Sequence, residues 1–150
     1  MLNLHDATQV AEITARIKAL RPDSPRQWGK MTAPQMVAHC SIALEAALGD
    51  RHVPRVFIGR LIGGFVKKAV LGKDGPFSKN APTAPSYVVA DERDLERERS
   101  HLLTLVDRFA SGGARACTKE PHAFFGTLTP DEWAVLMYKH LDHHLRQFGV

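Results

Sequence analysis

Apolar residues recur along this chain at the three- and four-residue spacing of helices that bury one side. The pattern predicts five helical segments, at about 6–20, 33–48, 54–71, 91–111 and 129–148. Strand-like alternation is not convincing anywhere, and residues 86–89 are the best short candidate. The glycine- and proline-containing stretch 72–90 reads as a long irregular crossover. We therefore predict an all-α fold, a bundle of four main helices with one additional helical segment.

The starts of two of these helices carry a specific signal. Thr32 is followed by Pro34 and Gln35, and Thr129 by Pro130 and Glu132. Each set is a capping box: the threonine hydroxyl accepts from the backbone N–H of the residue three positions on, and the side chain of that residue accepts from the threonine N–H. Proline is tolerated in the first turn of a helix. Both helices therefore have well-defined first turns.

The segment 54–71 differs from the other four in its glycine content. Three glycines, Gly59, Gly63 and Gly64, interrupt it, and each costs about 1 kcal/mol against alanine in a helix. Its apolar residues share one side and its basic residues lie elsewhere, a composition that fits a wall of the bundle, a dimer interface or a membrane-surface helix. We expect one of the first two, with membrane contact through 55–68 as the weaker alternative.

Length and composition restrict the class of protein. The 150 residues are most simply one domain, 1–150, with a hydrophobic content of 44% and a net charge of +4. Apolar runs fall short of the roughly 20 residues of a membrane span, and the first residues do not resemble a signal peptide. Two cysteines, Cys40 and Cys117, suggest no disulfide framework, so we expect a cytoplasmic protein. The basic residues are scattered, and we expect no nucleic-acid partner.

Three histidines stand close together in the last helical segment, at positions 140, 143 and 144. His140 and His144 are four residues apart and share one helix face. His39 lies in the middle of the apolar side of segment 33–48. Because facing helices of a bundle can build metal sites from inward side chains, these three predict a metal centre with open positions for water or substrate. The alternative is that they are core histidines hydrogen-bonded to the backbone.

Neighbouring polar residues are candidates for supporting roles. His143 lies about 100° round the helix from His144, so it either faces solvent or supports the ligands. Gln147 either orients a ligating imidazole or is solvated near the helix end. Asp142 is a weak candidate for a general base, and Arg146 is either a surface residue or a contact for an acidic substrate.

Three motifs carry a resemblance to a known family. They are Trp28-Gly29-Lys30-Met31-Thr32, Gln35-Met36-Val37-Ala38-His39-Cys40 and the segment from Lys139 to Gly149. Together they resemble the DUF1569 branch of the DinB/YfiT-like superfamily, over essentially the whole chain. The superfamily pattern of one histidine in the second helix and His-x3-His-x2-Gln on the last maps onto His39, His140, His144 and Gln147.

That resemblance implies an up-up-down-down four-helix bundle, a divalent metal (zinc, nickel, manganese or iron in relatives) and often a homodimer. Characterised relatives include transferases and isomerases that use bacillithiol, mycothiol or glutathione, whereas the DUF1569 branch has no assigned reaction. We therefore expect a metal-dependent enzyme that activates water or a low-molecular-weight thiol for attack on a small electrophilic substrate. A non-catalytic metal-binding or interaction protein is the alternative, and we identify no catalytic residue beyond the metal ligands.

Overall fold

The computed structural model describes residues 1–73 and 75–150. Within those ranges the elements are α-helices and short 3-10 helices, with no strand, so the all-α prediction is confirmed. Residues 86–89, the candidate strand, instead overlap a 3-10 turn. The elements are α1 (Ala7–Ala19), α2 (Ala33–Leu48), α3 (Phe57–Leu71), η1 (Pro85–Tyr87), α4 (Leu95–Gly112), η2 (Gly113–Arg115) and α5 (Pro130–Gln147).

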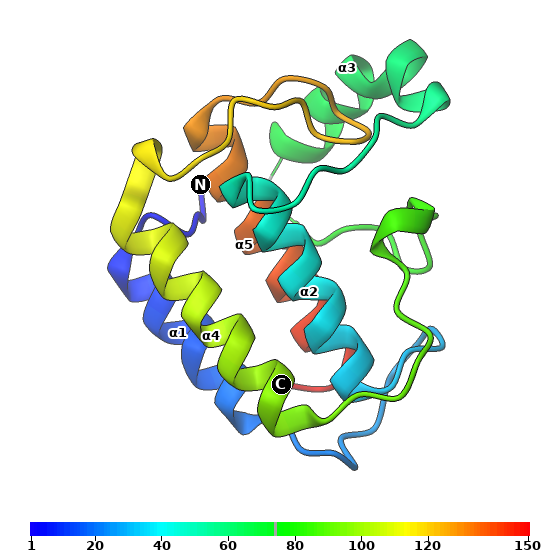
Figure 1. The fold of residues 1–150 in the computed structure, drawn as a ribbon, viewed down its shortest axis with the longest axis vertical. Helices are drawn as coiled ribbons and strands as arrows, with labels where there is room; N and C mark the ends of the chain where they lie inside the picture. The colour runs from blue at the N-terminus through cyan, green and yellow to red at the C-terminus, as the bar shows by residue number, and fades with distance from the viewer. Residues whose placement is uncertain (74) are drawn as a thin grey trace.

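Four helices enclose the core, with α1 and α2 each packed against both α4 and α5 (Figure 1). Near the starts of α1 and α5, the Leu4 backbone N–H donates to Ala134 O, and further along Arg16 reaches Asp142, so these two helices run in the same direction. In Figure 1, α2 and α4 both run the opposite way. The order along the chain is therefore up-down-down-up, and the up-up-down-down order implied by the resemblance is wrong. The connection between α2 and α4 is long enough to return the chain to the end at which α2 began.

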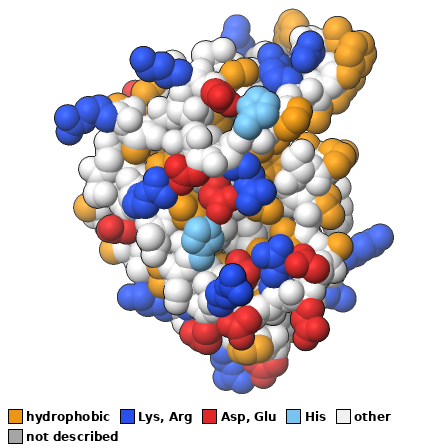
Figure 2. Space-filling view, in the orientation of Figure 1, with side chains coloured by type: hydrophobic (Ala, Val, Ile, Leu, Met, Phe, Trp, Pro, Cys, Tyr) orange, Lys and Arg blue, Asp and Glu red, His pale blue; other side chains and the backbone are white. Residues whose placement is uncertain are grey.

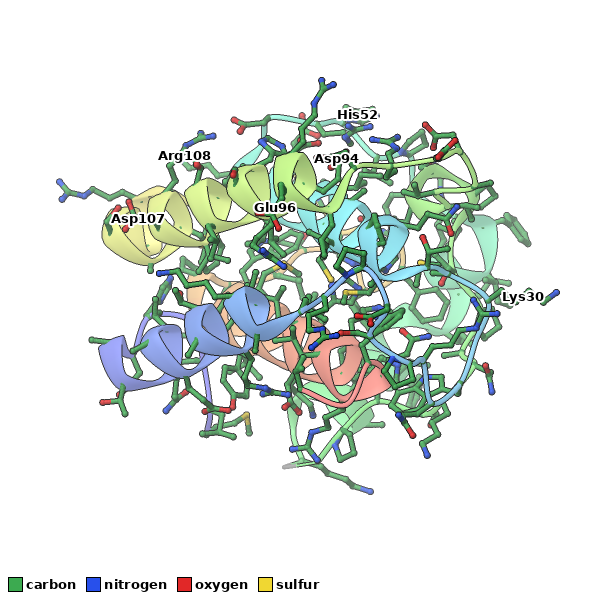
Figure 3. All side chains as sticks on the ribbon, turned by 90° about the horizontal axis from the view of Figure 1, so that it is seen from below. Lys30, His52, Asp94, Glu96, Asp107 and Arg108 are labelled. Atoms are coloured by element: carbon green, nitrogen blue, oxygen red, sulfur yellow. The ribbon has the colours of Figure 1, made fainter. Side chains whose placement is uncertain are left out.

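The core consists of the side chains that the helical spacing singles out. Ile13 and Ile17 of α1, Leu102 and Phe109 of α4 and Leu141 of α5 are each at most 1% exposed. In Figure 3 side chains fill the space between the helices, whereas the charged Arg108 of α4 points away from them. Many residues of α2 on this core are alanines, which allow its neighbours to approach closely.

Helix starts follow their capping residues. Both capping boxes are present, at Thr32 and at Thr129. The α4 helix begins at Leu95 rather than at Asp91, because the Asp94 side chain accepts from the Arg97 N–H at 2.8 Å and so fixes the first turn there. Similarly, α3 begins at Phe57, three residues after the proline from which it was predicted to start.

The α3 helix lies outside the four core helices (Figure 1). Its buried positions are Gly59, Gly63 and Leu71, whereas its large apolar side chains face outward. The prediction that this apolar side is a wall of the bundle is therefore wrong, while a dimer interface stays a prediction. In the part of the chain that the structure describes, no helix has both the length and the hydropathy to cross a membrane.

Candidate metal centre

Three histidines from two helices meet between α2 and α5. His39 comes from α2, and His140 and His144 come from successive turns of α5. One ring nitrogen from each lies within 4.8 Å of the others, and the Nε2 atoms of His39 and His140 are 3.0 Å apart. The structure therefore brings together the three residues that the sequence singles out.

The orientation of His39 is fixed by a backbone carbonyl. Its Nδ1 lies 2.8 Å from the carbonyl oxygen of Tyr87, in η1. A carbonyl oxygen can only accept, so Nδ1 carries the proton and donates it. In the neutral ring Nε2 therefore has a free lone pair, and this is the nitrogen that faces His140.

His144 is oriented in the same way, but by a side chain. Gln147 Nε2 donates to the carbonyl oxygen of Trp28 at 2.8 Å, which fixes the amide with its nitrogen toward Trp28. The amide oxygen then faces His144 Nδ1 at 2.8 Å and accepts its proton. The Nε2 atom of His144 is left unprotonated, so Gln147 orients this imidazole, and it is buried rather than solvated.

Gly29 makes room for that amide. A Cβ atom at position 29 would lie 2.5 Å from Gln147 Nε2, and the φ angle of +81° is one that side-chain-bearing residues rarely adopt. The Trp28-Gly29 pair thus supplies both the acceptor for Gln147 and the space beside it. Trp28 and Gly29 belong to one of the motifs that carry the family resemblance, but their spacing does not predict that they hold the Gln147 amide.

Burial keeps all three histidines neutral. It lowers the pKa of His39, and it lowers the pKa of His140 well below 6.5, with the neighbouring histidines adding to the effect. The pKa of His144 falls to about 3, first through burial and then through His39. The neutral imidazole is the form that binds a metal ion.

The donor set fits a divalent ion. Two ligands at 2.0–2.1 Å in tetrahedral geometry lie about 3.3 Å apart, close to the 3.0 Å between the Nε2 atoms of His39 and His140. Cys40 follows His39 but contacts Met36, with its sulfur 3.7 Å from the methionine sulfur. Burial raises the pKa of the Cys40 thiol, so it is a core residue rather than a ligand or nucleophile.

His143 is buried, being 7% exposed, so it does not face solvent. Its ring lies 5.4 Å from Trp28 and 5.8 Å from Phe77, measured between ring centroids, and it also contacts His144. His143 thus packs with Trp28 and Phe77 beside His144, and a role in supporting metal ligands stays a prediction.

Asp142 and Arg146 form an ion-pair cluster instead of facing the histidines. Arg16 Nη1 lies 2.8 Å from Asp142 Oδ1, and Arg146 Nε lies 2.9 Å from Asp142 Oδ2. Both carboxylate oxygens are therefore engaged by guanidinium groups, an arrangement that favours a structural role over that of a general base. Arg146 is 58% exposed at its side chain, in keeping with the surface reading.

His122, from the loop before α5, also lies near the site, although no spacing in the sequence points to it. Its Nδ1 accepts from the N–H groups of Phe124 and Phe125, both at 3.1 Å, so its Nε2 carries the proton. Burial, followed by the charge of Arg55, lowers the pKa of His122 to about 4. Its charge, when present, would further lower the pKa of His140.

Comparison with protein families gives one result. Residues 2–149 match the model of a family described as "Protein of unknown function (DUF1569)", and the chain belongs to this family. Searches of curated proteins and of solved structures find no match.

Proposed function

We propose that the protein binds a divalent metal ion through His39, His140 and His144 and uses it in a DinB-like enzyme reaction. The observation that carries the proposal is the convergence of three imidazoles whose ring nitrogens lie within 4.8 Å of one another. In two of them the other nitrogen is already committed to an acceptor, at Tyr87 O and at Gln147 Oε1. Ligating histidines in metalloproteins are held in this way.

The chemistry of the donors favours some ions over others. An all-imidazole set suits zinc, nickel and iron, whereas manganese prefers carboxylate ligands, and the described residues add no carboxylate to this cluster. Three protein ligands also leave room for water or a substrate atom, as catalytic zinc sites do. Zinc or nickel is therefore the first ion to test.

The reaction that this site supports is activation of a nucleophile. A bound divalent ion supplies Lewis acidity that lowers the pKa of water or of a low-molecular-weight thiol. Around the three imidazoles, Trp28 and Phe77 pack against His143, while Gln147 Oε1 and Tyr87 O hold His144 and His39 each in one tautomer. With an ion bound, the water or thiol would give up its proton to solvent and would then be able to attack a small electrophilic molecule.

A second candidate is a metal-binding protein without catalysis. It is favoured by the engagement of Asp142 with two arginines and by the tautomer of His122, which leaves neither group as an evident general base. The two candidates share the metal site and differ only in turnover.

Metal analysis of the purified full-length chain tests the shared part. We expect about one zinc or nickel ion per chain after loading, and loss of this ion in His140→Ala. The control is His52→Ala, which removes an exposed histidine that pairs with Glu120. Failure to bind either ion, together with a melting temperature unchanged by chelator, would overturn the proposal.

Turnover separates the two candidates. The metal-loaded protein is assayed for conjugation of bacillithiol, mycothiol and glutathione to a panel of electrophiles and for hydrolysis of the same compounds. Activity that disappears in His140→Ala and survives in His52→Ala supports the enzyme. Metal binding without any turnover supports the non-catalytic role.

A further inference from the structure

The outward side of α3 is the largest group of exposed apolar side chains on the described part of the chain. Phe57 is 75% exposed, Leu61 64% and Phe65 84%, and Ile58 and Ile62 are also exposed. In Figure 2, hydrophobic side chains gather at the upper right, where α3 lies in Figure 1, with Lys and Arg side chains beside them. A contiguous apolar surface of this kind marks an interaction site.

The helix is fixed so that this side must face outward. Its inner side is made of glycines: a Cβ at Gly59 would lie 2.6 Å from Phe124 O, and one at Gly63 only 2.1 Å from it. Lys67 forms an ion pair with Glu132 of α5 at 2.9 Å. The close backbone contact leaves no space to turn a large apolar side chain inward, so the helix cannot bury this side by rotating.

The charges on the same segment are all positive. Residues 55–73 contain Arg55, Arg60, Lys67, Lys68 and Lys73, and no aspartate or glutamate. Lys68 lies on the same side of the helix as Leu61, two turns further on, and Arg60 lies at the edge of that side. The described residues include no acidic partner for either of these two cations.

We propose that this side of α3, with Lys68 at its C-terminal end and Arg60 at its edge, docks on an anionic lipid surface. An interfacial helix of this type buries its apolar side at the boundary between head groups and acyl chains, while its cations contact anionic head groups. The same charges oppose a second copy of the chain as the occupant, because two such segments would bring unpaired cations together without acids to offset them. A lipid surface of negative charge complements both features at once.

The last turn of α3 is hydrogen-bonded to the helix that carries His140 and His144. Lys139 Nζ donates to the carbonyl oxygens of Val70, in α3, and of Lys73, just after it, and Lys139 directly precedes His140 in α5. Lipid docking of α3 would therefore bring the histidine cluster near the membrane surface.

Vesicle co-sedimentation of the full-length protein tests this. We expect binding to vesicles of phosphatidylcholine with about a third phosphatidylserine, weaker binding at high salt, and little binding to phosphatidylcholine alone. The double variant Leu61→Ser/Phe65→Ser should abolish sedimentation, and Lys68→Glu should weaken it about tenfold. Both changes are at exposed positions, and circular dichroism should show unchanged helix content. Lys18→Glu, an exposed lysine of α1, is the matched control and should sediment as the unmodified protein does.

Three results would each overturn the proposal. The first is failure to bind anionic vesicles, and the second is binding that Leu61→Ser/Phe65→Ser leaves unchanged. The third is a stable dimer in solution that does not bind vesicles and that the same double variant converts to monomer, which would assign the surface to a second copy of the chain.

Discussion

Gln147 accepts a hydrogen bond from His144 Nδ1 at 2.8 Å while its own amide nitrogen donates to Trp28 O. This relay joins the loop before α2 to the last turn of α5 and sets the tautomer of one proposed ligand. Because only the amide can donate at one end and accept at the other in this geometry, the relay depends on glutamine itself.

Replacing Gln147 should weaken metal binding without unfolding the protein. In Gln147→Leu the imidazole of His144 is no longer held in one tautomer, and we expect zinc affinity to fall about 10- to 100-fold. Affinity is measured by competition with a chromogenic chelator. Gln27→Leu, which alters an exposed glutamine of the same loop region, is the control and should bind as the unmodified protein does. Equal affinity in Gln147→Leu would mean that His144 is not oriented through this amide.

Gly29 can be tested separately from the amide that it accommodates. In Gly29→Ala the new methyl group would lie 2.5 Å from Gln147 Nε2, so we expect a loss of about 1–3 kcal/mol in the free energy of unfolding and a lower zinc affinity. The matched control is Gly149→Ala, whose φ angle of +75° imposes similar backbone strain, but whose nearest atom would be 3.6 Å away. Urea unfolding measures both. If the two variants lose stability and zinc affinity equally, the clash with Gln147 is not the cause.

Zinc should stabilise the folded protein through the three histidines. An ion that binds only the folded state adds about 2.7 kcal/mol to the free energy of unfolding at a free concentration 100 times its Kd. We expect a higher melting temperature with zinc and a return to the metal-free value with chelator. In His39→Ala the shift should disappear, because Nε2 of His39 is lost from the cluster. A shift of the same size in His39→Ala would place the zinc elsewhere.

The sequence predicts the parts of this site that depend on helix periodicity, but not the contacts made by loops and backbone carbonyls. The i, i+4 spacing of His140 and His144 predicts a shared helix face, and the position of His39 on an apolar stripe predicts that it points inward. Tyr87 contributes only its backbone carbonyl, and His122 lies in an irregular loop, so neither leaves a periodic signal. Helix periodicity does not choose between the two roles of His143, because it describes one element, whereas the burial of His143 comes from Trp28 and Phe77 in two separate loops.

The same reasoning explains the outcome for α3. Its amphipathic pattern identifies a helix with one apolar side, and an apolar side normally packs inward. In α3 the glycine side is buried instead, because Gly59 and Gly63 lie against the backbone of Phe124. The hydropathy of the sequence does not indicate this backbone contact. The four-residue spacing of Gly59 and Gly63 places both on one face of α3, where they permit this close approach.

His122 should make the stability of the protein depend on pH. Its pKa falls from 6.5 to about 4 in the folded state, so below pH 6.5 the unfolded chain binds more protons. Stability is therefore lost as the pH falls through 6.5, and the loss continues down to about pH 4. His122 alone accounts for about 2 kcal/mol between pH 7 and pH 5.

Urea unfolding of His122→Asn at these two pH values, in the presence of chelator, checks the effect. Asparagine can still accept from the Phe124 and Phe125 N–H groups but does not titrate, so the pH 7 to pH 5 difference should shrink by that amount. His52→Asn, at an exposed position, should keep the full difference. If the free energy of unfolding of His122→Asn changes between pH 7 and pH 5 as much as that of the unmodified protein, His122 is not the source of the pH dependence.

The packing of α3 can be tested at two neighbouring glycines. Gly63→Ala would place a methyl group 2.1 Å from Phe124 O, a backbone atom that cannot move aside cheaply, so α3 must shift and we expect a loss of about 1–3 kcal/mol. At Gly64 a Cβ meets nothing within 4 Å, so Gly64→Ala should gain up to about 1 kcal/mol from helix propensity alone. Hydrogen exchange distinguishes local from global effects: Gly63→Ala should speed exchange in α3 more than in α1, α2, α4 or α5. If the two alanine variants change stability in the same direction, the contact with Phe124 does not hold α3 in place.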